Sequence, residues 1–429
     1  EVCFAVRRYL HLLRNRPFAA LWAGSTASAV GDAMTWVAIA WLGFERGGAG
    51  LVAALLVVST APVVVGGPVM GVALDRFERR RVLLTVNLVL GTAVGAVPVW
   101  AAVGGRAPTW LLFAVGGLYG LLKMANWAGV PSLIPDLVGS DELDTANAME
   151  SATFGIADVT GPAVAGALIG LIGAERVLAV DAATYLAFVV CLLALPRRRP
   201  ANVPSATEGE PAGVGEAGEP VRLRPAFAFL LRNAPVRATT LMYMVINAGE
   251  SMLVVLLPVY VRTVLGGGPR TYGLLVSVYA VGALSGTVVA GAVRWPWPLG
   301  RSIAVAAALS GSVLTLLALR PGAAGAAAVL GVAGLLASPL TVWAQTIRMR
   351  LIPERLRGRV FGTIRTLIQS TPPVGAAVAG ALLAGAGVAA AALAMAAAVA
   401  GPGLAGLRSR SLRPEATAES QVTEAVAAH

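Results

Sequence analysis

The amino-acid sequence predicts an all-α membrane protein whose 12 transmembrane helices form two parallel six-helix repeats. Three observations predict this fold class. The 429-residue chain is unusually apolar, apolar segments of membrane-spanning length recur about twelve times, and short motifs of the first half return in the second half. An apolar run of about 20 residues is long enough to cross a bilayer as a helix.

The composition indicates that lipid is the main environment of this chain. Hydrophobic residues make up 57% of it and charged residues only 13%, whereas a soluble globular protein carries about 25% charged residues. The net charge of +11 is compatible with a nucleic-acid partner. However, the basic residues are dispersed between apolar segments and are not gathered with stacking aromatic residues. We therefore expect the lipid bilayer, and no nucleic acid, as a partner.

The predicted helices follow one another through short connections rich in Gly, Pro or Arg, and one long polar segment divides them into two sets of six. Their ranges are 18–44, 51–74, 82–103, 109–130, 146–170, 176–195, 238–262, 272–293, 302–319, 325–347, 360–384 and 386–406. An even number of crossings places both ends of the chain on the same side of the membrane.

The distribution of basic residues predicts the orientation. If the ends lie inside, 26 of the 33 Lys and Arg residues fall in inner segments and six in outer loops. Loops on the cytoplasmic side carry the excess of Lys and Arg in membrane proteins. We therefore expect a multi-pass protein of the cell membrane with both termini in the cytoplasm.

The long polar segment predicts how the chain is divided. Residues 196–220 are rich in Pro, Gly, Ala and Glu and lack aromatic residues, a composition typical of disordered linkers. Residues 225–237 are apolar and basic, which favours a short helix on the inner membrane surface. The predicted parts are an N-terminal six-helix lobe (1–195), a cytoplasmic linker with this surface helix (196–236), a C-terminal six-helix lobe (237–406) and a cytoplasmic disordered tail (407–429).

Three short motifs recur at nearly one spacing across the linker. Leu12-Leu-Arg-Asn-Arg-Pro17 returns as Leu230-Leu-Arg-Asn-Ala-Pro235, 218 residues later. Leu-Ile-Pro at 133–135 returns after the same offset, and Val-Ala-Gly-Ala-Leu at 164–168 returns after 214 residues. Such order and spacing indicate two parallel structural repeats, as some transporter folds contain.

A charged loop separates the second and third predicted helices. Its glycine, acid and basic residues are Gly71, Asp75, Arg76, Arg79 and Arg80. With the two repeats and the mid-chain linker, this loop resembles the signature of the major facilitator superfamily, although Glu78 stands where that signature has a second glycine. The resemblance implies that Asp75 and Arg76 help to lock an inner gate in the outward-facing state.

Further motifs resemble the exporting members of this superfamily. Gly161, Pro162 and Gly166 in the fifth predicted helix resemble the Gly-Pro motif of exporters and antiporters. The segments 134–147 and 357–360 resemble the branch that contains macrolide-efflux proteins and the enterobactin exporter. The resemblance covers residues 12–406. Many proton-coupled members carry an arginine in the fourth helix, where Lys123 is the nearest cation here.

Two acids lie deep within predicted helices, where a charge costs about 2.5–3.5 kcal/mol or more. Asp32 shares a polar stripe with Ser28 in the first predicted helix, at helical spacing. Glu250 lies 218 residues later, with Tyr243 and Asn247 on its face of the seventh. We expect these five side chains to line a central cavity, where a carboxylate binds a proton or a cationic substrate. For Asp32 the alternative is a hydrogen bond that sets helix packing.

Three of the other charged residues within predicted helices are candidates for a role in the membrane interior. Asp158 lies in the fifth, three residues before the Gly-Pro motif, and either faces the cavity or sets packing. Asp181 lies nearer the outer end of the sixth and is expected to pair locally. Lys123 either faces the cavity or, the reading we favour, extends to the inner surface, as long basic side chains do.

Together these features predict a secondary active exporter of small amphipathic molecules, such as a drug, a natural product or a siderophore. We expect alternating access and proton-coupled antiport. The chain lacks a Walker-type ATP motif, so the proton gradient is the expected energy source, without cofactor or metal. A nutrient importer or facilitator of the same fold and a non-transporting receptor or scaffold remain alternatives. No nucleophile–base or metal constellation indicates an enzyme, and we expect a monomer.

Overall fold

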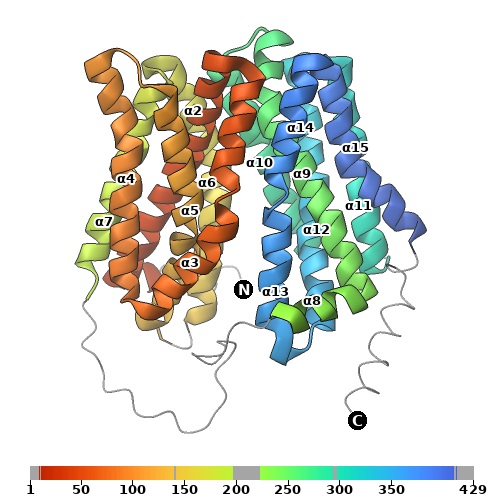
Figure 1. Ribbon diagram of the computed structural model, residues 1–429. Helices are drawn as coiled ribbons and strands as arrows, with labels where there is room; N and C mark the ends of the chain where they lie inside the picture. Colours follow the sequence, from red (N-terminus) through yellow and green to blue (C-terminus); the bar gives the residue numbers. More distant parts are fainter. Residues whose placement is uncertain are drawn as a thin grey trace, which may run out of the picture.

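The computed structural model describes residues 9, 11–139, 142–196, 223–292, 297–409 and 412. Within these ranges the chain is helical, and the helices form two bundles side by side (Figure 1). Eleven of the helices are long and apolar enough to cross a membrane. This confirms the predicted all-α membrane fold.

The first of these spans accounts for two crossings. It runs from Arg16 to Arg76 over 61 residues, which would be about 90 Å as one straight helix, three times the thickness of the hydrocarbon core. The backbone leaves the helical conformation at Gly47 and at Gly48, where φ is 61°. Gly43 then packs against Val52 and Leu55, so the chain reverses direction here. The described residues therefore make twelve crossings.

The N-terminal bundle contains the first six crossings. After the reversal, the second arm of α2 continues into α3 across a short break at residues 61–62, and both together form the second crossing. The elements are α2 (Arg16–Thr60), α3 (Val63–Arg76), α4 (Arg79–Gly104), α5 (Thr109–Leu133), η1 (Ile134–Asp136), α6 (Leu143–Ile172) and α7 (Ala174–Ala194).

The C-terminal bundle contains the other six. Two of its crossings are also interrupted: η2 continues α11, and α13 ends three residues before Pro372, where α14 begins. The elements are α8 (Leu223–Arg232), α9 (Ala234–Thr263), α10 (Pro269–Ala292), α11 (Leu299–Leu314), η2 (Thr315–Leu319), α12 (Ala323–Leu351), α13 (Glu354–Gln369), α14 (Pro372–Gly385) and α15 (Gly387–Arg408). Most of the predicted linker and tail lies outside the described residues.

The first recurring sequence motif has the same structural role in both halves. The Asn15 side chain accepts a hydrogen bond from the backbone N–H of Phe18 at the start of α2, and Asn233 does so from Val236 at the start of α9. Asparagine is a favoured residue at this position, and proline is tolerated in the first turn that follows. The motif therefore starts the first helix of each repeat.

Contacts between the bundles are most extensive where α6 meets α10 and where α2 meets α14. Gly166 lies against Pro269 and Gly273, and Gly380 lies against Ala53. All these residues lie toward the end of the molecule that carries the Gly47–Gly48 turn, which we call the outer end. Glycine at these points lets the helices approach closely.

Candidate functional site: a cavity between the two lobes

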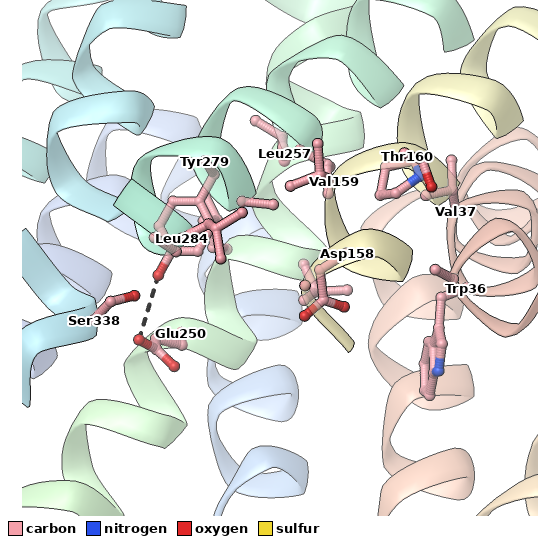
Figure 2. Close-up of a pocket in the computed structure, with 18 of the residues that line it drawn as sticks. Trp36, Val37, Asp158, Val159, Thr160, Glu250, Leu257, Tyr279, Leu284 and Ser338 are labelled. Atoms are coloured by element: carbon pink, nitrogen blue, oxygen red, sulfur yellow. Dashed lines mark hydrogen bonds between the residues drawn. The ribbon is translucent and has the colours of Figure 1, made fainter. Parts of the chain in front are cut away.

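A cavity of about 990 Å³ lies between the two bundles, and α2, α6, α9 and α10 supply most of its wall. The wall is mainly apolar. Among the described residues that line it, Asp158 and Glu250 are the charged ones, and both are exposed. They come from opposite lobes, and Figure 2 shows both carboxylates directed into the space between the helices.

Glu250 projects from α9 toward α10. The Tyr279 hydroxyl donates a hydrogen bond of 3.3 Å to its Oε1 (Figure 2). Asn247 also lines the cavity one turn before Glu250, while its amide donates to the backbone oxygen of Ile368 at 2.8 Å. Glu250 thus has one partner among the described residues and keeps acceptor capacity free for a ligand.

Asp158 projects from α6, one turn before the Gly-Pro motif. Trp36 of α2 lies in the same part of the wall (Figure 2). The sequence left the position of Asp158 open, and the structure places it in the cavity. Its role in transport stays a prediction.

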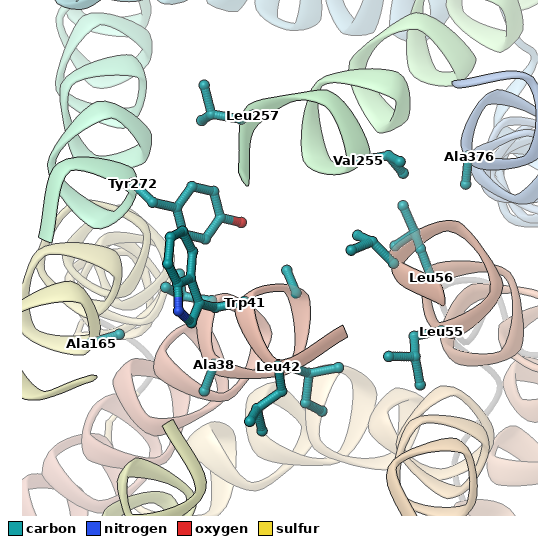
Figure 3. Packing of buried hydrophobic residues seen from close by; sticks show 14 of the residues in the cluster. Ala38, Trp41, Leu42, Leu55, Leu56, Ala165, Val255, Leu257, Tyr272 and Ala376 are labelled. Carbon is teal, nitrogen blue, oxygen red and sulfur yellow. The ribbon is translucent and has the colours of Figure 1, made fainter. Parts of the chain in front are cut away.

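The outer end of the cavity is closed by aromatic and aliphatic packing (Figure 3). Trp41 of α2 stacks on Tyr272 of α10, with ring centroids 6.0 Å apart and planes 27° from parallel. Both rings are buried, and Tyr272 also lines the cavity. The stack therefore closes this part of the cavity toward the end that carries the Gly47–Gly48 turn.

Asp32 does not line the cavity in this structure, contrary to the sequence-based expectation. It is buried within the N-terminal lobe, where it accepts a hydrogen bond from the Tyr185 hydroxyl and lies 3.8 Å from the Lys123 ammonium. Gly31 has no side chain, so α7 packs directly against this face of α2. Asp32 and Glu250 occupy corresponding depths in the two repeats but point toward different surroundings.

Two further candidates also lie outside the cavity wall. Ser28 is buried on the face of α2 that carries Asp32, and its hydroxyl has no hydrogen-bond partner among the described residues. The Tyr243 hydroxyl donates a hydrogen bond of 3.2 Å to the Thr341 hydroxyl. Its ring lies 5.1 Å from the Arg348 guanidinium. Neither side chain is in the wall of this cavity in the present conformation, and their roles in transport stay predictions.

Asp181 pairs locally with Thr184, as expected, but also with Thr35 of α2, whereas Lys123 does not extend to the inner surface. Asp181 is fully buried, and its carboxylate accepts hydrogen bonds from Thr35 at 2.5 Å and Thr184 at 3.0 Å. Lys123 points into the lobe toward Asp32 instead of extending to the surface. A sequence signal for Asp181 existed, because Thr184 and Tyr185 follow it at helical spacing and continue a polar face.

The charged loop between α3 and α4 is held to the N-terminal lobe by its arginines. Arg79 donates to the backbone oxygen of Ser132 at 2.9 Å. Arg80 donates to the backbone oxygens of Leu192 and Leu193, at 2.7 Å each. Asp75 and Arg76 are exposed and join no ion pair within the described ranges. The space beside Gly71 is open.

The Gly-Pro motif of α6 lies where three helices meet. Gly161 packs against Val30 and Ala33 of α2, and Gly166 packs against α10. Pro162 borders the cavity. The two glycines act here by allowing close packing of helices.

Comparison with known proteins assigns the chain to a family. The model of the transmembrane secretion effector family, within the major facilitator superfamily, matches residues 9–427. The chain belongs to this family of membrane transporters.

Two of the similar proteins are named as efflux pumps. The multidrug efflux pump Tap of Mycolicibacterium fortuitum is 27% identical over 373 residues, which are 84% of this chain and 87% of that protein. The macrolide efflux protein A of Streptococcus pyogenes is 24% identical over 183 residues, 42% of this chain and 45% of that protein. These relatives place the transporter in the efflux branch of the superfamily.

Solved structures share the fold at low sequence identity. A bacterial homologue of the iron transporter ferroportin, in an inward-facing state, has a TM-score of 0.71 at 17% identity and covers 92% of this chain and 98% of its own. The nucleoside transporter NupG has a TM-score of 0.69 at 11% identity, with coverages of 90% and 99%. Among the residues described for the present transporter, no group of His, Cys, Asp and Glu could hold a metal ion.

Proposed function

We propose that this transporter exports small amphipathic cations, such as cationic drugs or natural products, in exchange for protons. The observation that carries the proposal is the cavity. Its wall is mainly apolar, and its charged groups among the described residues are two carboxylates, one from each lobe. A cation bound between Asp158 and Glu250 would contact both lobes at once.

The size and chemistry of the cavity support a drug-sized amphipathic substrate. Ligand pockets measure about 300–1,000 Å³, and this one is at the upper end of that range. Trp36, Tyr272 and Tyr279 supply aromatic rings in its wall, and aromatic faces attract cations. The apolar remainder would accommodate different carbon skeletons, as in a transporter with several substrates.

The proposed direction of transport and the proposed energy source are supported by different observations. The relatives named as multidrug and macrolide efflux pumps favour export. The absence of an ATP-binding motif from the sequence favours an ion gradient. In a one-for-one exchange of a proton for a monovalent cation, a pH difference of one unit yields about 1.4 kcal/mol, enough to bias export about tenfold.

Alternating access would require the outer contacts to break and the inner side to close. The Trp41–Tyr272 stack and the α6–α10 and α2–α14 contacts hold the outer end closed. Asp75 and Arg76, which are exposed in this conformation, would then close the inner side in the outward-facing state.

The test is ethidium accumulation in inverted membrane vesicles that contain the transporter. Ethidium is a flat aromatic monocation. We expect Glu250→Gln and Asp158→Asn each to raise the ethidium concentration at half-saturation by about tenfold. A charge-assisted contact in a partly dehydrated site is worth about 1–2 kcal/mol. The matched control is Glu150→Gln, because Glu150 is a buried acid of α6 outside the cavity wall.

Four outcomes would contradict the proposal. Unchanged half-saturation in both cavity variants would mean that the carboxylates do not bind the cation. Accumulation that survives a protonophore would exclude proton coupling. Ethidium binding without any transport in proteoliposomes would favour a receptor or scaffold, and gradient-driven movement only in the opposite direction would favour an importer.

A further inference from the structure

The N-terminal lobe contains a second pair of acids, apart from the cavity. Asp32 on α2 and Asp181 on α7 are both buried, and neither belongs to the cavity wall. Asp181 accepts a hydrogen bond from Thr35, one turn beyond Asp32 on the same helix, and its carboxylate lies against Gly31, the residue before Asp32, so the two acids are close neighbours. The pair is unused by the binding site proposed above.

This pair has fewer counterions than charges. Lys123 of α5 lies 3.8 Å from Asp32, and it is the one cation that the described residues place in an ion pair with either acid. The remaining partners, Tyr185, Thr35 and Thr184, are neutral hydroxyl donors. If both acids were ionised, the interior of the lobe would carry a net negative charge, which is costly in a membrane.

We infer that Asp32 and Asp181 together hold one exchangeable proton and that this pair is the proton site of the transporter. Lys123 balances the negative charge of the carboxylate that stays ionised. The inference rests on the proposed exchange of cations for protons. It separates the two tasks: Asp158 and Glu250 bind the substrate, while the buried pair holds the proton. Release of the proton leaves one more ionised carboxylate in the lobe, and Lys123 stays charged throughout.

The other charged groups around this pair are few. On α6, Asp158 lies within electrostatic range of Lys123. From the C-terminal lobe, Arg365 of α13 lies 5.0 Å from the Trp127 ring, and the Lys123 ammonium lies 5.5 Å from the same ring. Lys123 thus faces Asp32 on one side and the Trp127 ring on another.

Helix α2 connects the proton pair to the cavity. Its residues Ala33, Trp36 and Val37 line the cavity, while Asp32 and Thr35 face the interior of the lobe. The Trp36 indole donates a hydrogen bond of 3.3 Å to the Tyr119 hydroxyl, which in turn accepts from Lys123. A substrate that presses on Trp36 therefore acts on the group that balances the pair.

Charge balance gives the exchange a physical reason. A cation entering the cavity adds one positive charge to the membrane interior, and a proton leaving the pair removes one. The exchange of one proton for one monovalent cation therefore keeps the buried net charge constant, and so avoids the cost of an additional charge in the membrane.

The test compares two kinds of ethidium transport by purified transporter in proteoliposomes. One is accumulation driven by a pH difference, and the other is exchange of labelled for unlabelled ethidium without any gradient. Electroneutral exchange predicts about a tenfold concentration ratio per unit of pH difference for the wild type. We expect Asp181→Asn to bring this ratio to about one and to keep gradient-free exchange within about twofold of wild type. The control Glu150→Gln, a buried acid outside the pair, should accumulate ethidium like the wild type.

Proton release provides a second measurement. Ethidium added to weakly buffered purified protein should release about one proton per transporter in the wild type and in Glu150→Gln, and none in Asp181→Asn. If Asp181→Asn does not fold, Asp32→Asn gives the same test, because Lys123 is then left with Asp181 as the one carboxylate of the pair.

The outcomes separate this inference from the proposed function. A wild type that does not accumulate ethidium along a pH difference contradicts the proposed proton exchange itself. If the wild type accumulates ethidium and Asp181→Asn does so equally, the proton site lies elsewhere and the inference fails. A folded Asp181→Asn that also loses gradient-free exchange would make Asp181 a structural residue, which likewise overturns the inference.

Discussion

At the scale of single residues, burial divides the acids of the membrane interior into two groups. Asp158 and Glu250 are exposed to the cavity, whereas Asp32 and Asp181 are surrounded by side chains of their own lobe. The difference arises from hydrogen bonding. Buried carboxylates need donors, and Tyr185, Thr35 and Thr184 supply them inside the lobe.

Gly31 makes this arrangement possible and gives a test of it. A Cβ at this position would overlap the Asp181 carboxylate and the Thr184 hydroxyl. We expect Gly31→Ala to destabilise the transporter by about 1–3 kcal/mol, as overpacking of a core does. The midpoint of thermal unfolding in detergent measures this loss.

The matched control is Gly401→Ala, since nothing lies within 4 Å of a Cβ built there on α15. It should leave the midpoint unchanged or raise it, because alanine favours helix more than glycine does. Equal midpoints for the two variants would contradict the close packing of α7 on α2.

At the scale of elements, α2 has three roles. Its first arm carries Asp32 on one face and the cavity residue Trp36 on another. Its second arm, beyond the Gly47–Gly48 turn, supplies Ala53, which contacts Gly380 of α14 across the two lobes. A movement of α2 would therefore affect the proton pair, the cavity and the outer closure together.

A disulfide between α2 and α14 should lock the outer end. The Ala53 Cβ lies 2.8 Å from a Cβ built on Gly380, and a small separation of the helices reaches the usual Cβ distance of about 3.8 Å in disulfides. In a background with Cys3 and Cys191 replaced by serine, we expect the pair Ala53→Cys and Gly380→Cys to cross-link and to abolish ethidium transport. Reduction should restore transport.

The two single-cysteine variants are the controls and should transport ethidium under oxidising and reducing conditions alike. Normal transport by the fully cross-linked double variant would show that the α2–α14 contact stays closed during the cycle. That result would contradict alternating access at this end.

At the scale of the whole molecule, two six-helix bundles enclose a cavity, and the charged residues in its wall, within the part of the chain that the structure describes, are the acids Asp158 and Glu250. The basic residues lie mainly in the segments expected on the cytoplasmic side, and the bundles meet most extensively toward the opposite end. This arrangement would open the site to cytoplasmic cations, as an exporter requires.

The orientation in the membrane is testable by labelling of single cysteines in the background that lacks Cys3 and Cys191. Arg106 and Phe77 are both exposed and lie in loops at opposite ends of α4. We expect Arg106→Cys to react with an impermeant maleimide added to intact cells, and Phe77→Cys to react only after the membrane is opened. The reverse pattern would place the termini outside, contrary to the excess of basic residues in the inner segments.

The sequence by itself determined the number of crossings, the repeat and the position of each acid along its helix. Apolar runs and their connections follow from the cost of placing polar backbone and charges in lipid, which acts locally along the chain. The start of each repeat could also be predicted from the sequence, because Asn15 and Asn233 cap their helices through local hydrogen bonds.

Only the tertiary structure decided which acids face the cavity. Helical spacing places Asp32, Ser28 and Thr35 on one face, but it does not say what packs against that face. Gly31 admits α7 there, and Tyr185 and Lys123 complete the surroundings of Asp32. Asp32 and Glu250 therefore have different environments although they occupy corresponding positions in the two repeats. The reason is that the neighbours of a helix face come from distant parts of the chain.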